Sequence, residues 1–534
     1  MKTADDIVRR YDALKGARGQ WEDHWQEVAE YIFPRRSGFN VYNSPGEKKM
    51  QKIVDGTGVQ ALELLAAGLH GFASNPSSRW FSIKTTDDDL NQNDAVREWL
   101  GQVEDIIFSR MHSPSSAITS HLHELYMDYA AFGTGVMFIG VGERDNLLFQ
   151  TRFLGECVID ENAEGVVDTV IRSFSWTVRQ VYQKWGDKCS AQVRKWYADG
   201  KFDEPVDLIH AVFPRVERDM ARATPDNMPV ASIYMEKKDK HTLQEGGFEE
   251  FPYAVPRWYK VAGEKYGRSP AMTALPDVKM LQEMARTTIK AAQKIVDPPL
   301  LVPDDAMIGP VATIPGGLNF YRGEREISPL QTGANIPISL EMMQDLRNRI
   351  MKTFYADIMQ PAMEKQMTAY EYSKIVEQAM RLLGPVVGRM QSELLGITIS
   401  RVFGILARTG QLPEQPEELD GREFSVEYVS PLANAQRAQK IDSAIQLITI
   451  AGQIAAFAPR VLERFNEDGF LQWAGNELNV DAELILDDEE LAQKQQAAQN
   501  QQMMAAAPDL AKAFQASGQG AKSFAEAGAV ANGG

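Results

Sequence analysis

The residues of this chain with the types and spacing of a metal site lie in the segment SHLHELYMDY. It holds His121, His123 and Glu124 on a stretch with helical spacing. A zinc helix of the form H-E-x-x-H needs a second histidine one helical turn after the first. Position 127, where that histidine would fall, is methionine. We therefore interpret the segment as the solvated face of a helix.

A second cluster of candidate groups is the run of three aspartates at 87–89. A two-metal nuclease needs carboxylates that converge on one point, whereas adjacent side chains point in different directions. The pattern favours a solvated turn over a DNA-cleaving enzyme. The chain also has no P-loop and no nucleophile elbow, and its Gly-x-Gly pairs lack the third glycine of a dinucleotide loop. We predict no enzyme, no metal and no cofactor.

The charge of the chain restricts what it can bind. Among 534 residues the net charge is −17, and Lys and Arg are scattered along the sequence. A protein that grips DNA through its phosphates needs a basic patch, and the sequence shows none, so tight, sequence-reading DNA binding is not expected. Loose contact with DNA stays open. Cys157 and Cys189 match no metal or redox spacing, which favours a reducing compartment without disulfides.

Membrane insertion is not expected either. The most apolar runs, 130–141 and 445–458, would span roughly 18–21 Å as helices, against about 30 Å for a bilayer core. A chain of 534 residues is too long for one core, so we expect several packed regions.

The periodicity of apolar residues divides the chain into helical and mixed parts. Helices are predicted over 5–33, 59–69, 94–111 and 116–132. Extended runs between 149 and 260 then predict an α+β region, in which Thr177 and Gln180 form a capping box that opens a short helix.

Two amphipathic helices follow. In the first, Pro276 and Asp277 suit an N-terminus, and one apolar face runs to Val296. The second covers 339–358. Each has about 20 residues, or about 30 Å, so they match as two helices packed side by side would. The roughly 40 residues between them far exceed an ordinary helix connection and predict a small separate lobe.

A helix of near 40 residues, about 60 Å, is predicted from 368 to 408. Gly384 and Pro385 lie inside it, and Pro385 removes the backbone bond to Arg381, so a bend is expected there. Such a rod suits a protein that spans between layers of an assembly. An ordinary long core helix with a tolerated proline explains the spacing equally well.

Four stretches of the sequence resemble the portal (head-to-tail connecting) proteins of short-tailed phages. They are RRYDALKGARGQWEDHWQEVAEYIFPRR (9–36), GRSPAMTALPDVKMLQEMARTTIKAAQKIVDPPLLVP (267–303), MTAYEYSKIVEQAMRLLGPVVGRMQSELL (367–395) and SPLANAQRAQ (430–439). The third and fourth are specific when they occur together in this order. The resemblance covers about 9–440.

The resemblance implies a mainly α portal-type fold with an α+β wing, assembled as a ring, usually of twelve copies, around a DNA channel at one capsid vertex. It implies the following parts: helical wing 1–135, α+β wing 136–266, first stem helix 267–296, clip 297–338, second stem helix 339–358, tunnel loop 359–367, long kinked helix and wing strand 368–432, helical crown 433–490, low-complexity tail 491–534.

The resemblance also implies partners and channel residues. The partners are further copies of the chain, double-stranded DNA bound without sequence specificity, the terminase, the tail adaptor, and scaffolding, capsid and internal core proteins; no membrane is involved. The protein is expected at a capsid vertex of the virion, after assembly in the host cytoplasm. The candidate channel residues are Glu364, Lys365 and Gln366 in the tunnel loop and Lys279, Lys290, Lys294, Arg347 and Arg349 on the stem.

Two alternatives stay open at this point. The stem cations are explained equally well as solvated side chains or as salt bridges between subunits. The whole chain could instead be another structural virion protein, such as a tail or internal core component, without a DNA channel. Under the portal reading, twelve copies at −17 each would carry −204, and an acidic channel would let DNA slide without binding tightly.

Overall fold

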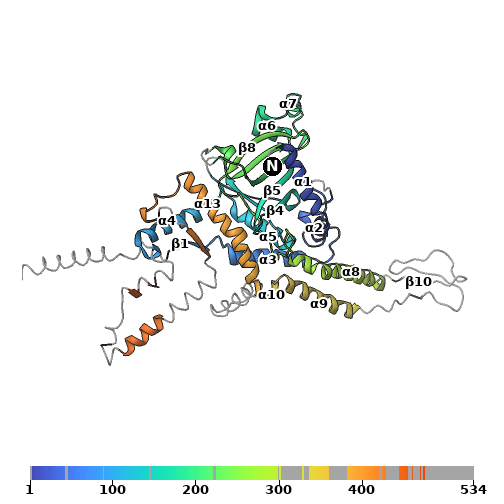
Figure 1. Cartoon of the computed structure of the whole chain (residues 1–534). Helices are drawn as coiled ribbons and strands as arrows, with labels where there is room; N and C mark the ends of the chain where they lie inside the picture. Colours follow the sequence, from blue (N-terminus) through green and yellow to red (C-terminus); the bar gives the residue numbers. More distant parts are fainter. Residues whose placement is uncertain are drawn as a thin grey trace, which may run out of the picture. The chain divides into compact units, whose positions relative to one another are not determined.

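This computed structural model describes most of the chain up to residue 428 and short pieces beyond. The described ranges are 3–41, 46–77, 79–87, 90–142, 146–219, 224–296, 298, 300–301, 328–329, 336–359, 382–419, 424–428, 444–454, 460, 469–470 and 473–474. The chain divides into two units, 1–432 and 433–534, at the boundary where the sequence analysis begins the crown. The fold combines helices with sheet, as the sequence predicts (Figure 1).

The first two helices correct the prediction of one helix over 5–33. Helix α1 covers Ala4–Ala17 and α2 covers Gly19–Tyr31, with a break at Arg18. The buried Arg18 guanidinium donates to Glu22 at 2.6 Å, to the Leu154 carbonyl at 3.1 Å and to the Gly155 carbonyl at 2.6 Å. The two carbonyls are remote in sequence, so periodicity cannot reveal the break.

Three further helices build the main core with α2. Helix α3 covers Thr57–Ala73, α4 covers Asp94–Met111 and α5 covers Ile118–Phe132. The limits of α4 are those predicted, because Asn93 accepts hydrogen bonds from the amides of Ala95 and Val96 as an N-cap. Helix α3 is longer at both ends than the predicted 59–69.

The α+β region is an antiparallel five-stranded sheet in the order β4-β5-β6-β7-β8. The strands are β4 Cys157–Glu161, β5 Val167–Thr177, β6 Pro205–Pro214, β7 Val230–Glu236 and β8 His241–Phe248. The two faces of β6 pack in different cores, because successive side chains of a strand point to opposite sides. Ile209 and Ala211 pack with α1, whereas Val212 packs in the main core. The capping box of Thr177 and Gln180 is confirmed, and opens α6, Val178–Trp185, which α7, Ala191–Ala198, follows.

Three smaller sheets tie distant segments together. Strands β2 Met137–Val141, β3 Leu147–Thr151 and β9 Tyr253–Ala254 form one. Strand β1, Phe81–Thr85, pairs with β12, Phe424–Tyr428, and was not predicted. Strand β10, Leu300–Leu301, pairs with β11, Ser328–Pro329, near the two ends of the predicted lobe.

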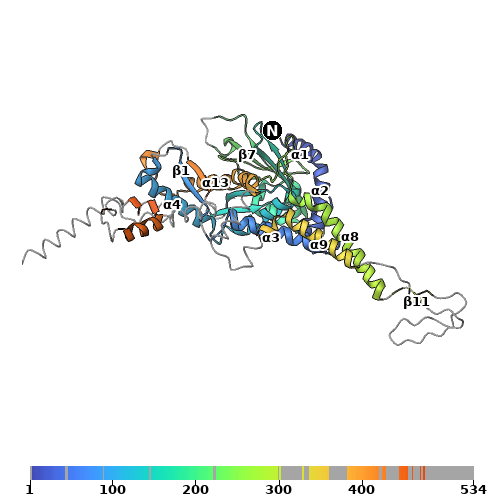
Figure 2. The same ribbon diagram turned by 90° about the horizontal axis from the view of Figure 1, so that it is seen from below.

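Helices α8, Pro270–Val296, and α9, Ile336–Thr353, lie side by side in both Figure 1 and Figure 2. Pro276 lies inside α8, so its assignment to the N-terminus is wrong: the amide of Met272 donates to Ser269 Oγ at 3.0 Å, and the helix begins there. The helices have 27 and 18 residues, so the predicted equal length is also wrong. Helix α9 ends just before Tyr355, because Tyr355 has a φ of 55°, which lies outside the right-handed helical region. A short helix, α10, Ala356–Met359, follows.

The long helix is described from residue 382. Residues 382–390 are helical, a π-turn covers Gln391–Leu395, and α13 covers Gly396–Arg408. In the second unit, residues 444–454 are helical.

Candidate functional site

The packing of α8 against α9 is confined to part of α8. Residues three and four apart on α8 (Val278, Leu281, Ala285) and on α9 (Met343, Leu346, Ile350) are buried in the main core. This spacing places one side of each helix toward the other elements of unit 1. Beyond Ala285 no residue of α8 is buried, although the apolar stripe continues.

The exposed part of that stripe is large. Ile289 is 50% exposed and Val296 is 86% exposed. At 100° per residue, both lie on the side of α8 that holds Val278 and Leu281. The outer half of α8, residues 286–296, therefore presents an uncovered apolar side within one chain.

A polar residue lies within the buried half of the same stripe. Gln282 is 2% exposed, and its Oε1 accepts hydrogen bonds from the amides of Val54 and Asp55 at 2.7 and 2.8 Å. Its Nε2 donates to the Asp55 carbonyl at 2.7 Å. Gln282 thus fastens α8 to the chain just before α3. The sequence analysis missed this role, although a glutamine beside Val278, Leu281 and Ala285 is a usable signal.

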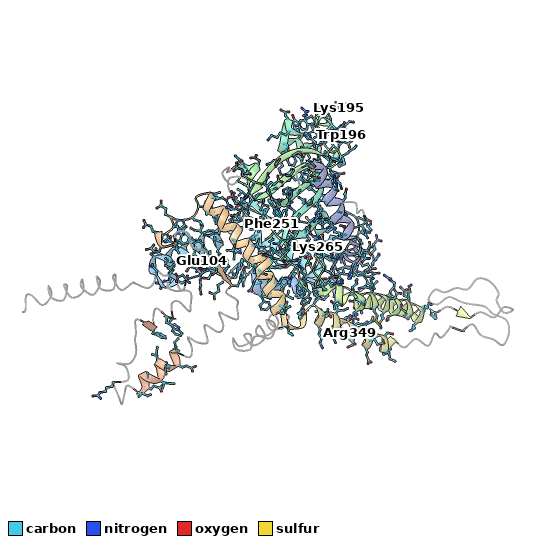
Figure 3. The ribbon with its side chains drawn as sticks, viewed as in Figure 1. Glu104, Lys195, Trp196, Phe251, Lys265 and Arg349 are labelled. Carbon is cyan, nitrogen blue, oxygen red and sulfur yellow. The ribbon has the colours of Figure 1, made fainter. Side chains whose placement is uncertain are left out.

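The five predicted stem cations divide into two groups. Lys279 pairs with Glu27 at 2.8 Å, Arg347 contacts Asp55 at 3.0 and 2.9 Å, and Arg349 pairs with Asp277 at 2.9 Å. Figure 3 labels Arg349 on α9. Lys290 and Lys294 are exposed, and we find no ion pair between them and any described carboxylate. Three of the five charges are therefore neutralised by acids of the same chain.

Asp55 receives more than one donor. Burial would raise the pKa of its carboxyl, but hydrogen bonds from Thr57 and the Arg347 guanidinium outweigh burial and hold the pKa below its usual value. Asp55 connects α3, α8 and α9: its carboxylate accepts from Thr57 and Arg347, and its backbone carbonyl accepts from Gln282.

The predicted tunnel loop and part of the predicted kink lie outside the described residues. Glu364, Lys365 and Gln366 fall in the undescribed range 360–381. Gly384 and Pro385 lie in the described helical residues 382–390, and a Cβ added at Gly384 would meet no described side chain within 4 Å. Pro385 has no amide hydrogen to donate to the carbonyl of Arg381, and Arg381 lies outside the described residues. The bend stays a prediction.

The structure shows an irregularity in the long helix that the sequence analysis missed, the π-turn Gln391–Leu395. π-turns often mark functional sites because they shift the phase of a helix. Glu393 in this turn accepts from the Arg257 guanidinium at 2.6 Å and from the Arg257 amide at 2.8 Å. Arg257 is 2% exposed and also donates to Glu161 at 2.8 Å and to the Gly165 carbonyl at 2.8 Å.

The Arg257 network connects the sheet to the long helix. Burial would raise the pKa of Glu161, but hydrogen bonds from Lys260 and Arg257 outweigh it, so the pKa is lowered. Arg257 is buried, so removing either carboxylate would leave its charge less well compensated and destabilise this contact. No local pattern could have indicated this site, since Glu161 and Glu393 lie 96 and 136 residues from Arg257.

The π-turn is also held from β12. Tyr428 Oη donates to the Gln391 carbonyl at 2.9 Å. A Cβ at Gly396 would lie 2.7 Å from Tyr428 Oη, closer than real Cβ contacts, so a larger residue at this position would displace the Tyr428 hydroxyl.

The residues considered for catalysis do not converge on a metal. His121 Nδ1 lies 3.7 Å from Glu124, and among the described residues no group of three or more His, Cys, Asp or Glu could hold an ion. Asp88 and Asp89 are outside the described residues. Cys157 and Cys189 are both buried and free. In the described part of the chain, no helix is both long and apolar enough to cross a membrane.

Comparison with known proteins identifies the class. A model of the family "Bacteriophage head to tail connecting protein" matches residues 4–486. This chain belongs to that family.

Two curated relatives match over nearly their whole length. The "Probable portal protein" of Bordetella phage BPP-1 is 33% identical over 498 residues, 91% of this chain and 89% of the relative. The "Portal protein" of Salmonella phage epsilon15 is 30% identical over 535 residues, 97% of this chain and 95% of the relative.

Solved structures with similarity include the neck of a native gene transfer agent particle determined with C12 symmetry. It is 10% identical, with 78% of this chain and 94% of that chain covered and a TM-score of 0.37.

Proposed function

We propose that this chain is the portal of a phage capsid, a ring of twelve copies at one vertex through which the genome enters and leaves. The ring would bind the packaging terminase first and the tail adaptor afterwards. Its role is structural, and DNA would pass without sequence-specific contacts. Scaffolding, capsid and internal core proteins would be its other partners, with assembly in the host cytoplasm.

The observation that carries the ring is the uncovered outer half of α8. Exposed apolar residues that continue a buried stripe mark a surface that another molecule covers. Ile289 and Val296 are in this position. In a ring, the stem helices of neighbouring copies would cover them, because a closed assembly repeats the same contact at every interface.

The charge of the stem supports a channel in which DNA slides. Pairing of Lys279, Arg347 and Arg349 with acids of the same chain leaves fewer cations to hold phosphates. On the stem, Lys290 and Lys294 are the remaining candidates. Lys365, with Glu364 and Gln366, would be the tunnel-loop contact, and the bend at Gly384 and Pro385 would turn the long helix over the wing.

The parts of the fold are assigned accordingly. α8 and α9 would form the stem, the segment between them the clip, and the residues from 433 to 490 the crown. The sheet with α1 to α7 would form the wing.

The test is an end-on electron micrograph of the purified chain under assembly conditions. Twelve copies of 59.6 kDa total about 715 kDa, and the particle should show a central hole. A particle of rod form without a hole would support the alternative virion component. A species that stays at 59.6 kDa under every assembly condition would contradict the ring.

A further inference from the structure

The hairpin of α6 and α7, residues 178–202, has a charge opposite to that of the whole chain. Within a chain of net charge −17, these 25 residues carry six basic side chains against two acidic ones, a local net charge of +4. The basic residues are Arg179, Lys184, Lys188, Arg194, Lys195 and Lys201. The acids are Asp187 and Asp199.

The basic side chains are exposed, and all except Lys184 lack side-chain partners among the described residues. All six belong to exposed residues, and none forms an ion pair with a described carboxylate. Lys184 alone has another partner: its ammonium lies 4.5–5.1 Å from the ring centres of Trp176, Trp185 and Tyr234. The other five are available to an external anion, and Figure 3 labels Lys195 at the hairpin's outer end.

The hairpin is a rigid support for these charges. Val178, Val181, Trp185 and Val193 form a core of their own with β6 and β8. The rings of Tyr182 and Tyr197 stack across the two helices with centres 3.8 Å apart. The helices that carry the cations are therefore fixed, so only the lysine and arginine side chains, and not the backbone, have to be ordered on binding.

We propose that this hairpin binds the phosphate backbone of double-stranded DNA on the outside of the molecule, separate from any channel. Lysine is depleted from protein–protein interface cores, whereas a surface of unpaired lysines and arginines suits a repeating polyanion. Phe202, 42% exposed, is the one large apolar side chain of 178–202 that is strongly exposed. An acidic protein partner would need a larger apolar centre than this. The inference rests on the proposed function only in taking DNA as the polyanion at hand.

The test uses the full chain and a relaxed, covalently closed DNA circle, which cannot thread a ring and so reports only outer contacts. The variant combines Arg179→Gln, Arg194→Gln, Lys195→Gln and Lys201→Gln. The matched control removes four exposed cations elsewhere, Lys48, Arg110, Arg218 and Lys238, by the same change. Binding is measured by electrophoretic mobility shift and by fluorescence titration from about 50 to 200 mM salt.

The hairpin variant should bind the circle about tenfold or more weakly at about 100 mM salt, and the slope of log K against log salt should fall by roughly 3–4. The control should keep most of the affinity and slope. Equal losses in both variants, or none in either, would overturn the inference. Tighter binding of polyglutamate than of the circle, lost in the same variant, would assign the hairpin to an acidic protein instead. Micrographs of the same samples test the ring separately, so failure of one proposal is distinguishable from failure of the other.

Discussion

The two halves of α8 differ in where their partners lie. In the inner half, residues 270–285, the apolar stripe is buried, Gln282 hydrogen-bonds to the chain before α3, and Asp277 pairs with Arg349. In the outer half, residues 286–296, the same apolar stripe continues into solvent. The single apolar stripe of α8 therefore packs inside the chain in its inner half and is left exposed in its outer half. The inner half is stabilised by its own chain, and we infer that the outer half is stabilised by neighbouring copies.

The largest expected loss of stability comes from shortening a buried side chain in the inner half of α8. Leu281→Ala should reduce the free energy of local unfolding around α8 by about 2–5 kcal/mol, because a buried leucine leaves a cavity. Ile289→Ala, at the half-exposed position, should cost less than about 1 kcal/mol in the unassembled chain. Hydrogen exchange of the α8 amides measures both. Equal losses of protection would show that the halves do not differ.

A somewhat smaller effect is expected from the buried glutamine. Gln282→Leu keeps the volume but leaves the amides of Val54 and Asp55 without their acceptor, which should cost about 1–3 kcal/mol. Gln293→Leu in the exposed outer half is the matched control and should be near neutral. The urea midpoint for loss of α8 protection reports the difference; a control as damaging as Gln282→Leu would argue against it.

Acid should weaken the inner half through Asp55. The pKa of Asp55 is lower in the folded chain than its usual 3.8, so its contribution to stability is present above pH 3.8 and is lost as pH falls through the folded value. Between pH 6 and pH 3 the wild-type urea midpoint should fall more than that of Asp55→Asn. Parallel curves for the two proteins would mean that Asp55 does not stabilise this contact.

The smallest effect on stability should come with a large effect on assembly. The double variant Ile289→Ser, Ile295→Ser should change local unfolding by less than about 0.5 kcal/mol in the unassembled chain, since both side chains are half-exposed. Ring formation, measured by sedimentation, should shift to a higher protein concentration. Unchanged assembly would contradict the inference that neighbouring copies of the chain cover the outer half of α8.

Features governed by neighbours along the chain could be predicted from the sequence. The limits of α4 and the capping box of Thr177 and Gln180 depend on side chains within a few residues, and both are as predicted. The pairing of two long helices around a long excursion was also visible. Pro276 misled the prediction because a proline is tolerated near a helix start, and Ser269 caps the helix earlier.

Features governed by distant residues could not be predicted. The break at Arg18 depends on carbonyls near residue 155, and β1 is a strand because β12 pairs with it some 340 residues later. The basic hairpin is a different case. Its six cations all lie between residues 179 and 201 of the printed sequence, but the net charge of −17 conceals them when the chain is taken as a whole.

The sequence by itself indicated the class of protein, because four of its stretches resemble portal proteins. It also determined the helical pair and the absence of familiar catalytic motifs, because these depend on periodicity and on residues close together in the chain. The tertiary structure alone decided which charges are paired. Lys279, Arg347 and Arg349 were equal candidates with Lys290 and Lys294 until folding brought Glu27, Asp55 and Asp277 beside the first three. Ion pairing falls off within a few ångströms, and such distances between remote residues are fixed only by the fold.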